Sequence, residues 1–436
     1  MNISVVTLFP QLYQPFFQTS LMKKAVDKKL LSCAVKTLFD YVEPKERIDG
    51  PTFGHNSGML IRPEVVERAV LDLDQQFGKS FKIFLSPQGT KLTQPVSKKL
   101  WETIEKHEHV MFVAGRYEGI DARVEQVYAD AIISIGDFVL MGGDIPAMVV
   151  MESVFRHMPG IVGKQESVDL DSFSGALVDY PEYTKPVIWN GIEVPEVLRS
   201  GDHKAIELWR EEQAMKLTVT KHFDWLRSGI ISNQQKKLAQ KFVPAHFVAL
   251  MHTGIALKDG RVGTTSVTSI DVHDIARSAT TYNIQDYFIV TPLVDQQKIV
   301  KTILDFWQEK ETGIEYNKHR HEAISRVHVE SELHNVLEKI EKNTGQKPII
   351  IGTSARFEHG SSKMISYHDQ AKIWSQNRPV LILLGTGHGM GQELIDRCDY
   401  FFPPLHGLSN FNHLSVRSAA AIIFDKWLGF DVQRYL

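Results

Sequence analysis

The sequence contains few cysteines and lacks any long apolar run. Cys33 and Cys398 are the only cysteines among 436 residues, and no C-x-x-C pair occurs. These absences exclude a disulfide framework and a thiolate zinc site. No apolar stretch approaches the ~18 residues of a membrane span, and the N-terminal residues lack the pattern of a signal peptide. We therefore expect a cytoplasmic protein that does not associate with a membrane.

The chain also lacks an excess of charge of either sign. Forty-nine Lys and Arg against 52 Asp and Glu leave a formal net charge of −3. This balance argues against a polybasic protein that binds nucleic acid by bulk charge, but it leaves a local basic surface open. Apolar residues make up 43% and charged residues 23%, which is typical of globular proteins. At roughly 150 residues per domain, the length predicts two or three domains.

Familiar nucleotide and hydrolase motifs are missing too. No G-x-G-x-x-G follows the first strand, and there is no G-x-x-x-x-G-K-[ST], H-E-x-x-H or G-x-S-x-G sequence. These motifs position phosphates, catalytic metals and nucleophilic serines. Their absence disfavours NAD-binding, ATP-binding and metallohydrolase functions.

The chain does contain a repeated pattern of short apolar runs that end in Gly- or Pro-containing loops. The runs are 83–85, 110–113 and 131–134 in the first half, and 348–351, 380–384 and 400–402 in the last quarter. Without polar alternation, they predict strands buried on both faces of parallel sheets, and hence two α/β domains. Open α/β sheets bind ligands at the carboxyl ends of their strands. Any one of these loops can be explained as a structural turn. Three such loops in succession instead favour a narrow binding site for a flat purine ring.

The middle of the chain has a different pattern. Residues 201–241 show helical periodicity and no strand signal, whereas 169–184 are rich in Asp, Ser, Gly, Tyr and Pro and predict a linker. A new strand at 246–250 marks the start of the second α/β domain.

Four motifs of the first half carry a specific resemblance. They are Leu-Ser-Pro-Gln-Gly at 85–89, Gly-Arg-Tyr-Glu-Gly-Ile-Asp at 115–121, Ser-Ile-Gly-Asp-Phe-Val-Leu at 134–140, and Asp-Ser-Phe at 171–173 ahead of Val-Pro at 194–195. Together they resemble the TrmD family of bacterial tRNA (guanine-N1)-methyltransferases, over residues 1 to about 240. The resemblance implies the SPOUT class, in which a parallel sheet tied in a deep trefoil knot holds S-adenosylmethionine.

The same resemblance implies a substrate, a partner and a set of cofactor-binding residues. It implies a homodimer that methylates the guanosine at position 37 of tRNA, with Mg²⁺ as an additional requirement for methyl transfer. The implied cofactor-binding residues are Leu85, Ser86, Pro87, Gln88, Gly115, Tyr117, Glu118, Ser134, Ile135, Gly136, Asp137, Phe138, Val139, Leu140, Gly142, Gly143 and Pro146.

Arg156 and Asp171 match the catalytic Arg and Asp of this family. The chemistry needs such a pair, because guanine N1 carries a proton that a carboxylate must remove before the nitrogen can attack a methyl group. A guanidinium stabilises the negative charge that then develops on O6. The alternative is a helix N-cap Asp and a structural Arg. Because Asp171 falls in the predicted linker, we expect it to become ordered when tRNA binds.

The sequence departs from the family at the loop that contacts the target nucleotide. Residues 53–59 read Phe-Gly-His-Asn-Ser-Gly-Met, so that His55 and Asn56 replace two glycines, and Asp144 stands where a Glu is usual. We expect these changes to alter affinity for the target guanine or choice of the neighbouring base. In the helical region, Lys216, Lys221 and Arg227 remain candidate phosphate contacts, although exposed helical charges are often merely solvated.

The last part of the chain carries motifs of its own. Residues 264–277, 385–389 and 412–419 are similar to a family of predicted S-adenosylmethionine-dependent RNA methyltransferases, again of the SPOUT class, from about 245 to the end. The cofactor-binding residues implied here are Leu384, Gly385, Thr386, Gly387, Pro404, Leu405, Leu414, Ser415 and Val416. Asp271, His273, Asp274 and Arg277 form either an N-cap network or a catalytic or RNA-contacting site. No third ligand follows at metal spacing, so the sequence predicts no metal site.

These observations predict an α/β chain with two SPOUT-type domains, each with a parallel sheet and a trefoil knot, separated by a small all-helical domain. The predicted limits are 1–165 for the first domain, 166–185 for a linker that carries Asp171, 186–241 for tRNA-binding helices and 245–436 for the second domain. The second domain is either a methyltransferase with its own RNA target or a non-catalytic module that binds cofactor or RNA. A non-catalytic RNA-binding protein and a small-molecule transferase are the alternatives for the whole chain.

Overall fold

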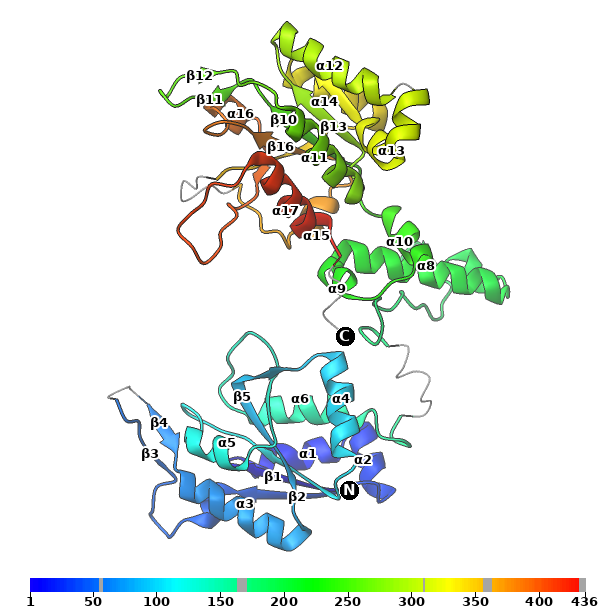
Figure 1. Cartoon of the computed structure of the whole chain (residues 1–436). Helices are drawn as coiled ribbons and strands as arrows, with labels where there is room; N and C mark the ends of the chain where they lie inside the picture. The colour runs from blue at the N-terminus through cyan, green and yellow to red at the C-terminus, as the bar shows by residue number, and fades with distance from the viewer. Residues whose placement is uncertain (55–57, 163–170, 309, 356–362, 431–436) are drawn as a thin grey trace. The chain divides into compact units, whose positions relative to one another are not determined.

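The computed structural model describes residues 1–54, 58–162, 171–308, 310–355 and 363–430, which divide into two compact units (Figure 1). The first unit is Met1–Gly175 and the second is Ala176–Leu436. Both contain a parallel sheet with helices on its two faces, so the α/β class is confirmed.

The sheet of the first unit has five parallel strands in the order β2-β1-β6-β5-β7. Its strands are β1 (Asn2–Thr7), β2 (Ser32–Thr37), β5 (Phe81–Lys91), β6 (His109–Val113) and β7 (Ala131–Ser134), with a separate hairpin of β3 (Asp49–Pro51) and β4 (Met59–Ile61). The helices are α1 (Tyr13–Phe17), α2 (Ser20–Asp27), α3 (Pro63–Phe77), α4 (Gln94–Ile104), α5 (Ala122–Tyr128) and α6 (Asp144–Phe155), with short 3-10 turns at Pro10–Leu12 and Leu38–Tyr41.

Both faces of this sheet are covered, which explains why its strands lack polar alternation. Ile3 and Val5 of β1 point into a core shared with α2, α4 and α6. Val6 points into the opposite core, which α3 completes. Successive side chains of a strand alternate between faces, so only a fully apolar strand suits both cores.

The second unit contains a six-stranded parallel sheet in the order β14-β13-β10-β16-β15-β17. Its strands are β10 (His246–Met251), β13 (Asp286–Val290), β14 (Val327–Glu330), β15 (Ile349–Gly352), β16 (Val380–Gly385) and β17 (Tyr400–Phe401). Two hairpins stand apart, β8 (Ile188–Trp189) with β9 (Ile192–Glu193) and β11 (Ile255–Ala256) with β12 (Val262–Gly263). Its helices are α8 (His203–Lys221), α9 (Phe223–Ser228), α10 (Asn233–Gln240), α11 (Ser269–Thr281), α12 (Val294–Gln308), α13 (Lys310–Ile324), α14 (Leu333–Thr344), α15 (Gln370–Trp374), α16 (Gln392–Asp396) and α17 (Val416–Leu428), with a 3-10 turn at Glu196–Arg199.

The helices of 201–241 form as predicted, but they share a core with the second sheet. Figure 1 shows α8, α9 and α10 close to α15 and α17. Phe223 is 5% exposed, and its ring lies 4.7 Å from that of Trp374. Arg227, expected as a phosphate contact, instead donates hydrogen bonds of 2.6 and 2.8 Å to the carbonyls of Lys426 and Asp425 near the C-terminal end of α17. These contacts join the helical segment to the second unit.

No helix in the described part of the chain is long and apolar enough to span a membrane.

Candidate functional site

In the first unit, a bulge in β5 brings two of the predicted cofactor loops together. Ile133 of β7 pairs with both Leu85 and Thr90 of β5, so the residues between them loop out of the strand beside the end of β7. A Cβ on Gly89 would lie 2.5 Å from the backbone of Ile132, so only glycine fits this close approach. Ser86, Pro87 and Gln88 of the bulge therefore lie near Ser134, Ile135 and Gly136.

A third loop, after β6, is joined to the segment that precedes α6. The amide of Gly143 donates a 2.8 Å hydrogen bond to the carbonyl of Gly115, and Arg116 forms a bridge with Gly142. A Cβ on Gly142 would lie 2.3 Å from Cδ of Arg116, so a side chain here would displace the Arg116 side chain from its present position. Tyr117 is exposed and has a φ of 61°, which turns the loop sharply.

The rest of the predicted cofactor segment is largely exposed. Asp137 forms a 2.5 Å ion pair with Lys91, which ties this segment to the end of β5. Four further predicted residues, Glu118, Phe138, Val139 and Leu140, are exposed, and Pro146 is half-buried in the first turn of α6. The structure thus gathers the predicted residues of three loops at the carboxyl ends of β5, β6 and β7, where Phe138, Val139 and Leu140 are exposed and Leu85 and Ile135 pack partly against the core.

Asp144 fixes this arrangement, whereas the sequence marked it only as a departure from the family and did not reveal its anchoring role. Its side chain is fully buried and accepts hydrogen bonds from Arg116 Nε at 2.9 Å, from Tyr13 Oη at 3.1 Å and from Thr7 Oγ1. Burial and the adjacent Asp144 carboxylate raise the pKa of Tyr13 above its usual range, so the phenol stays a donor. Asp144 therefore anchors the Gly115 loop to the carboxyl end of β1. An acidic residue directly after the Gly-Gly pair was the only sequence signal.

The two predicted catalytic residues lie next to each other. Arg156 is the C-cap of α6, and its Nη2 forms an ion pair with Oδ2 of Asp171, a contact that lacks hydrogen-bond geometry. Both side chains remain partly exposed, at 37% for Arg156 and 27% for Asp171. Asp171 is placed by a turn in which its carbonyl accepts the amide of Ser174 at 3.0 Å. Residues 163–170 of the predicted linker lie outside the described residues.

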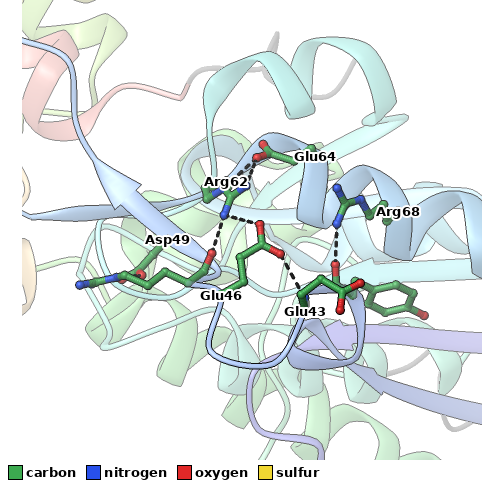
Figure 2. A network of polar contacts seen from close by, with 8 residues as sticks. Glu43, Glu46, Asp49, Arg62, Glu64 and Arg68 are labelled. Atoms are coloured by element: carbon green, nitrogen blue, oxygen red, sulfur yellow. Dashed lines mark hydrogen bonds and ion pairs between the residues drawn. The ribbon is translucent and has the colours of Figure 1, made fainter.

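A charged network holds the hairpin that carries the altered target loop. Figure 2 shows Arg62 between Glu46 and Glu64, with 2.8 Å contacts to a carboxylate oxygen of each, and Arg62 also donates to the carbonyl of Arg47 at 2.8 Å. Hydrogen bonds from the Glu43 backbone and from Arg62 hold the pKa of Glu46 below its usual range. Arg47 continues the network to Asp49 at the start of β3.

The hairpin in turn contacts a cofactor loop. The amide of Glu118 donates to the carbonyl of Met59 at 3.1 Å, and the amide of Ile61 donates to the carbonyl of Gly119 at 3.0 Å. Phe53 at the near end of the altered loop is 98% exposed, whereas the substituted His55 and Asn56 lie outside the described residues. Two backbone hydrogen bonds therefore join the hairpin to the loop after β6.

The second unit contains a cavity of about 880 Å³ at the carboxyl ends of β10, β15 and β16. Eight of the nine predicted cofactor residues line it, and the ninth, Pro404, lies between the lining residues Pro403 and Leu405. The lining predicted residues are Leu384, Gly385, Thr386, Gly387, Leu405, Leu414, Ser415 and Val416. The predicted residues come from three segments, 384–387, 405 and 414–416, which converge on one site, and its size suits a nucleoside-containing ligand.

A chain of hydroxyl groups in this cavity fixes the tautomer of His252. Thr386 Oγ1 donates to the carbonyl of Met251 at 2.9 Å, so Thr265 Oγ1, 2.6 Å away, must donate to Thr386. Thr265 can then only accept from Nδ1 of His252, at 3.0 Å. Burial lowers the pKa of His252 to about 4 against an opposing effect of Asp271, so the ring is neutral and Nε2 carries a lone pair.

Among the described residues, no group of three or more His, Cys, Asp and Glu side chains is placed to hold a metal ion. His273 and Asp274 thus have no companion ligand there, and no such cluster among these residues supports the Mg²⁺ that the resemblance implied for the first half.

Comparison with known proteins identifies the family. Residues 1–228 match the family described as tRNA (Guanine-1)-methyltransferase TrmD. A tRNA (guanine-N(1)-)-methyltransferase of Nitratidesulfovibrio vulgaris is 36% identical over 435 residues, which cover 98% of this chain and 99% of that protein. The chain belongs to the TrmD family of tRNA (guanine-N1)-methyltransferases. A second family member, from Oleidesulfovibrio alaskensis, is 35% identical over the same coverage.

TrmD family members differ in whether the first domain is extended by a second one. The relative from Persephonella marina is 38% identical over 240 residues, which cover 92% of that protein but only 55% of this chain. A solved structure, a tRNA (m1G37) methyltransferase from Aquifex aeolicus, is 34% identical, covers 48% of this chain and 87% of that chain, and has a TM-score of 0.41. The rest of this chain, residues 245–429, matches the family described as SAM-dependent RNA methyltransferase. Both halves therefore match methyltransferase families, and the description of the second names S-adenosylmethionine.

Proposed function

We propose that the first unit methylates N1 of the guanosine at position 37 of tRNA, using S-adenosylmethionine. The observation that carries this proposal is the contact between Arg156 and Asp171, because it provides a carboxylate and a guanidinium together in a partly exposed position. When bound, S-adenosylmethionine supplies an electrophilic methyl group. Asp171 accepts the proton of guanine N1, and Arg156 stabilises the negative charge on O6.

Three close-packed glycines support cofactor binding in the loops of this unit. Gly89 allows a backbone approach that any side chain would block, whereas a Cβ on Gly142 would meet the Arg116 side chain and a Cβ on Gly136 would lie 2.5 Å from the ring of Phe138. Loops held this tightly present fixed main-chain donors and acceptors to the edge of a purine. The uncovered apolar residues beside them suit its face.

We also propose that the active form is a homodimer. Gly142 and Gly143 of the cofactor loops precede α6, whereas Arg156 follows it. Twelve residues at a rise of ~1.5 Å make α6 roughly 18 Å long, which is too far for one copy to bring the pair to its own cofactor loops. Ile145 and Val149 of α6 and the neighbouring Met141 are exposed, at 52%, 41% and 90%, and a second copy would cover them.

For the second unit, we propose S-adenosylmethionine-dependent methylation of a second RNA site. Its support is the cavity lined by the predicted cofactor residues. From the resemblance we also propose the trefoil knots, the RNA-binding role of the helices and the domain limits given above. Lys216 and Lys221 of α8 are exposed, as phosphate contacts would be. Two free cysteines fit a cytoplasmic location.

The test is transfer of labelled methyl groups by the full chain to transcribed tRNA with guanosine or adenosine at position 37. We expect guanosine-dependent transfer, and roughly a 100-fold or greater fall in its rate for Asp171→Asn with tRNA affinity unchanged. Asp27→Asn, a substitution at a carboxylate that is 60% exposed, is the matched control. Full transfer by Asp171→Asn would refute the assignment of the base, and no guanosine-dependent transfer by the unaltered chain would refute the substrate.

Two inactive variants test the dimer. If each active site combines cofactor loops of one copy with Arg156 and Asp171 of the other, then mixing Gly142→Arg with Asp171→Asn chains restores up to about a quarter of the activity, since random exchange leaves one intact site in half of the dimers. Absence of any restored activity, with subunit exchange verified by mass spectrometry, contradicts the shared site.

A further inference from the structure

Asp271 in the wall of the second cavity has a carboxylate oxygen that no hydrogen bond within the described residues explains. The residue lies in the first turn of α11 and is only 7% exposed. Its Oδ2 accepts a 2.6 Å hydrogen bond from the N-cap residue Thr268, whereas Oδ1 accepts none. Buried carboxylate oxygens normally have hydrogen-bond partners. The hydrogen bond at the N-cap therefore satisfies only one of the two carboxylate oxygens of Asp271.

Arg417 faces that oxygen without satisfying it. It lies in the first turn of α17 and also lines the cavity. Its Nη1 is 3.6 Å from Oδ1 of Asp271, and its Nε is 3.6 Å from Oδ2 of Asp274. Both distances permit attraction between charges but exceed those of hydrogen bonds. The two side chains therefore attract each other, while the guanidinium can still donate hydrogen bonds and Oδ1 of Asp271 can still accept one.

His252 contributes a second unused acceptor to the same cavity. Its Nε2 carries the lone pair that the Thr265–Thr386 hydroxyl chain leaves there, and it has no hydrogen-bond partner among the described residues, although the ring is 1% exposed. Two buried acceptors beside a guanidinium call for a ligand that brings an N–H and a carbonyl oxygen together. The edge of guanine has this arrangement, since its N1–H and 2-amino group supply two donors beside the carbonyl oxygen O6, whereas uracil and hypoxanthine supply only one donor.

We propose that Asp271 and Arg417 are the catalytic pair of the second cavity, which act on the ring N–H of a nucleobase flanked by a carbonyl group. This inference rests on the proposed methyltransferase function of the second unit. The proton of the ring N–H passes to Asp271, and the nitrogen lone pair forms the bond to the methyl carbon. The carbon–sulfur bond of the sulfonium breaks and its electron pair stays on sulfur, which gives S-adenosylhomocysteine.

Arg417 stabilises the negative charge that deprotonation places on the base carbonyl oxygen, and His252 positions the base by accepting a hydrogen bond. A ribose hydroxyl fits less well, because it is far less acidic than a ring N–H and develops no charge on a neighbouring carbonyl for a guanidinium to stabilise. The structure therefore favours base methylation over methylation of the 2′ oxygen.

The experiment uses the full chain with Asp171→Asn, which silences the first site. Small RNA purified from cells that lack this gene is the probe, and labelled S-adenosylmethionine is the donor. We expect the remaining transfer to fall roughly 100-fold or more when Asp271→Asn or Arg417→Met is added. Asp295→Asn, at a carboxylate 92% exposed on α12, is the control and should retain at least half of the rate.

Two further measurements separate a catalytic role from a structural one. Calorimetry with S-adenosylhomocysteine should show two sites per chain in every variant, because the pair faces the acceptor and not the cofactor. Mass spectrometry of nucleosides digested from the product should place the label on a ring nitrogen of a base.

Each other outcome overturns a distinct claim. No transfer by the Asp171→Asn chain, despite two bound S-adenosylhomocysteine molecules, refutes the proposed function of the second unit and the pair with it. Transfer that persists at the control rate in Asp271→Asn or Arg417→Met refutes the pair alone, as does label on a ribose oxygen or a base carbon. Loss of the second S-adenosylhomocysteine site in Asp271→Asn or Arg417→Met assigns that residue to the cofactor and also refutes its acceptor role.

Discussion

Replacing Asp144 by Ala should destabilise the first unit strongly, because three donors converge on this one buried carboxylate. Removing one partner of a buried ion pair costs about 3–5 kcal/mol. Arg116 is 21% exposed, so its share lies at the lower end of that range. The hydroxyl groups of Tyr13 and Thr7, both fully buried, would also lose their acceptor. We expect a total loss of about 4 kcal/mol.

Urea unfolding should report this loss in the first unit alone. With a denaturant slope of about 2 kcal/mol/M, 4 kcal/mol lowers the midpoint by roughly 2 M. Because the chain has two units, pulsed hydrogen exchange at increasing urea should follow the amides of β1 and β6 separately from those of β10 and β16. Asp144→Asn keeps one acceptor oxygen for Thr7 and Tyr13 but loses the charge and turns an NH2 donor toward Arg116, so its midpoint should also fall, although less than that of Asp144→Ala.

Asp144→Ala should also weaken cofactor binding, since Arg116 would no longer hold the Gly115 loop against Gly142. We expect roughly tenfold weaker affinity of the first site for S-adenosylhomocysteine. A midpoint shift below about 0.5 M for Asp144→Ala, or equal shifts in both units, would show that Asp144 does not anchor this loop.

Three further outcomes depend on individual contacts. Burial lowers the pKa of His246 to about 4 in the folded chain against 6.5 when unfolded, so the unfolded state binds more protons as pH falls through this range. His246 should therefore account for about 2 kcal/mol of the stability that the second unit loses between pH 7 and pH 5, with a similar share from His252, and His246→Gln should reduce the loss by the His246 share in urea titrations. Gly89→Ala would place a Cβ 2.5 Å from the backbone of Ile132, so calorimetry should show at least tenfold weaker cofactor binding at the first site. Unchanged affinity would mean that the bulge can shift to accept a side chain. Phe223→Ala would remove the ring packed on Trp374 and should lower the free energy of unfolding of the second unit by about 3–4 kcal/mol. Protection of α8 from hydrogen exchange should fall with it. A stability equal to that of the exposed-site control Leu208→Ala would contradict this packing.

The local order of strands, loops and helices could be predicted from the sequence, because apolar runs and glycine positions report burial and close approach directly. The runs at 83–85, 110–113, 131–134 and 380–384 all became strands, and the loops after them carry the predicted cofactor residues. The choice of Arg156 and Asp171 as catalytic candidates came from the resemblance, whereas their contact is seen only in the structure.

Tertiary structure alone decided which polar groups meet. Asp144 could not be recognised as an anchor, because its donors come from β1, α1 and the loop after β6, and no spacing in the sequence encodes that meeting. Asp271 and Arg417 lie 146 positions apart and come together only when α11 and α17 pack side by side. The helices of 201–241 have an apolar face, but a face does not specify its partner. The sequence therefore determined which segments form strands, helices and cofactor loops, since those depend on local pattern. The tertiary fold decided that Asp144 anchors a loop, that Asp271 and Arg417 meet, and that the helices of 201–241 pack on the second sheet, since those depend on contacts between distant residues.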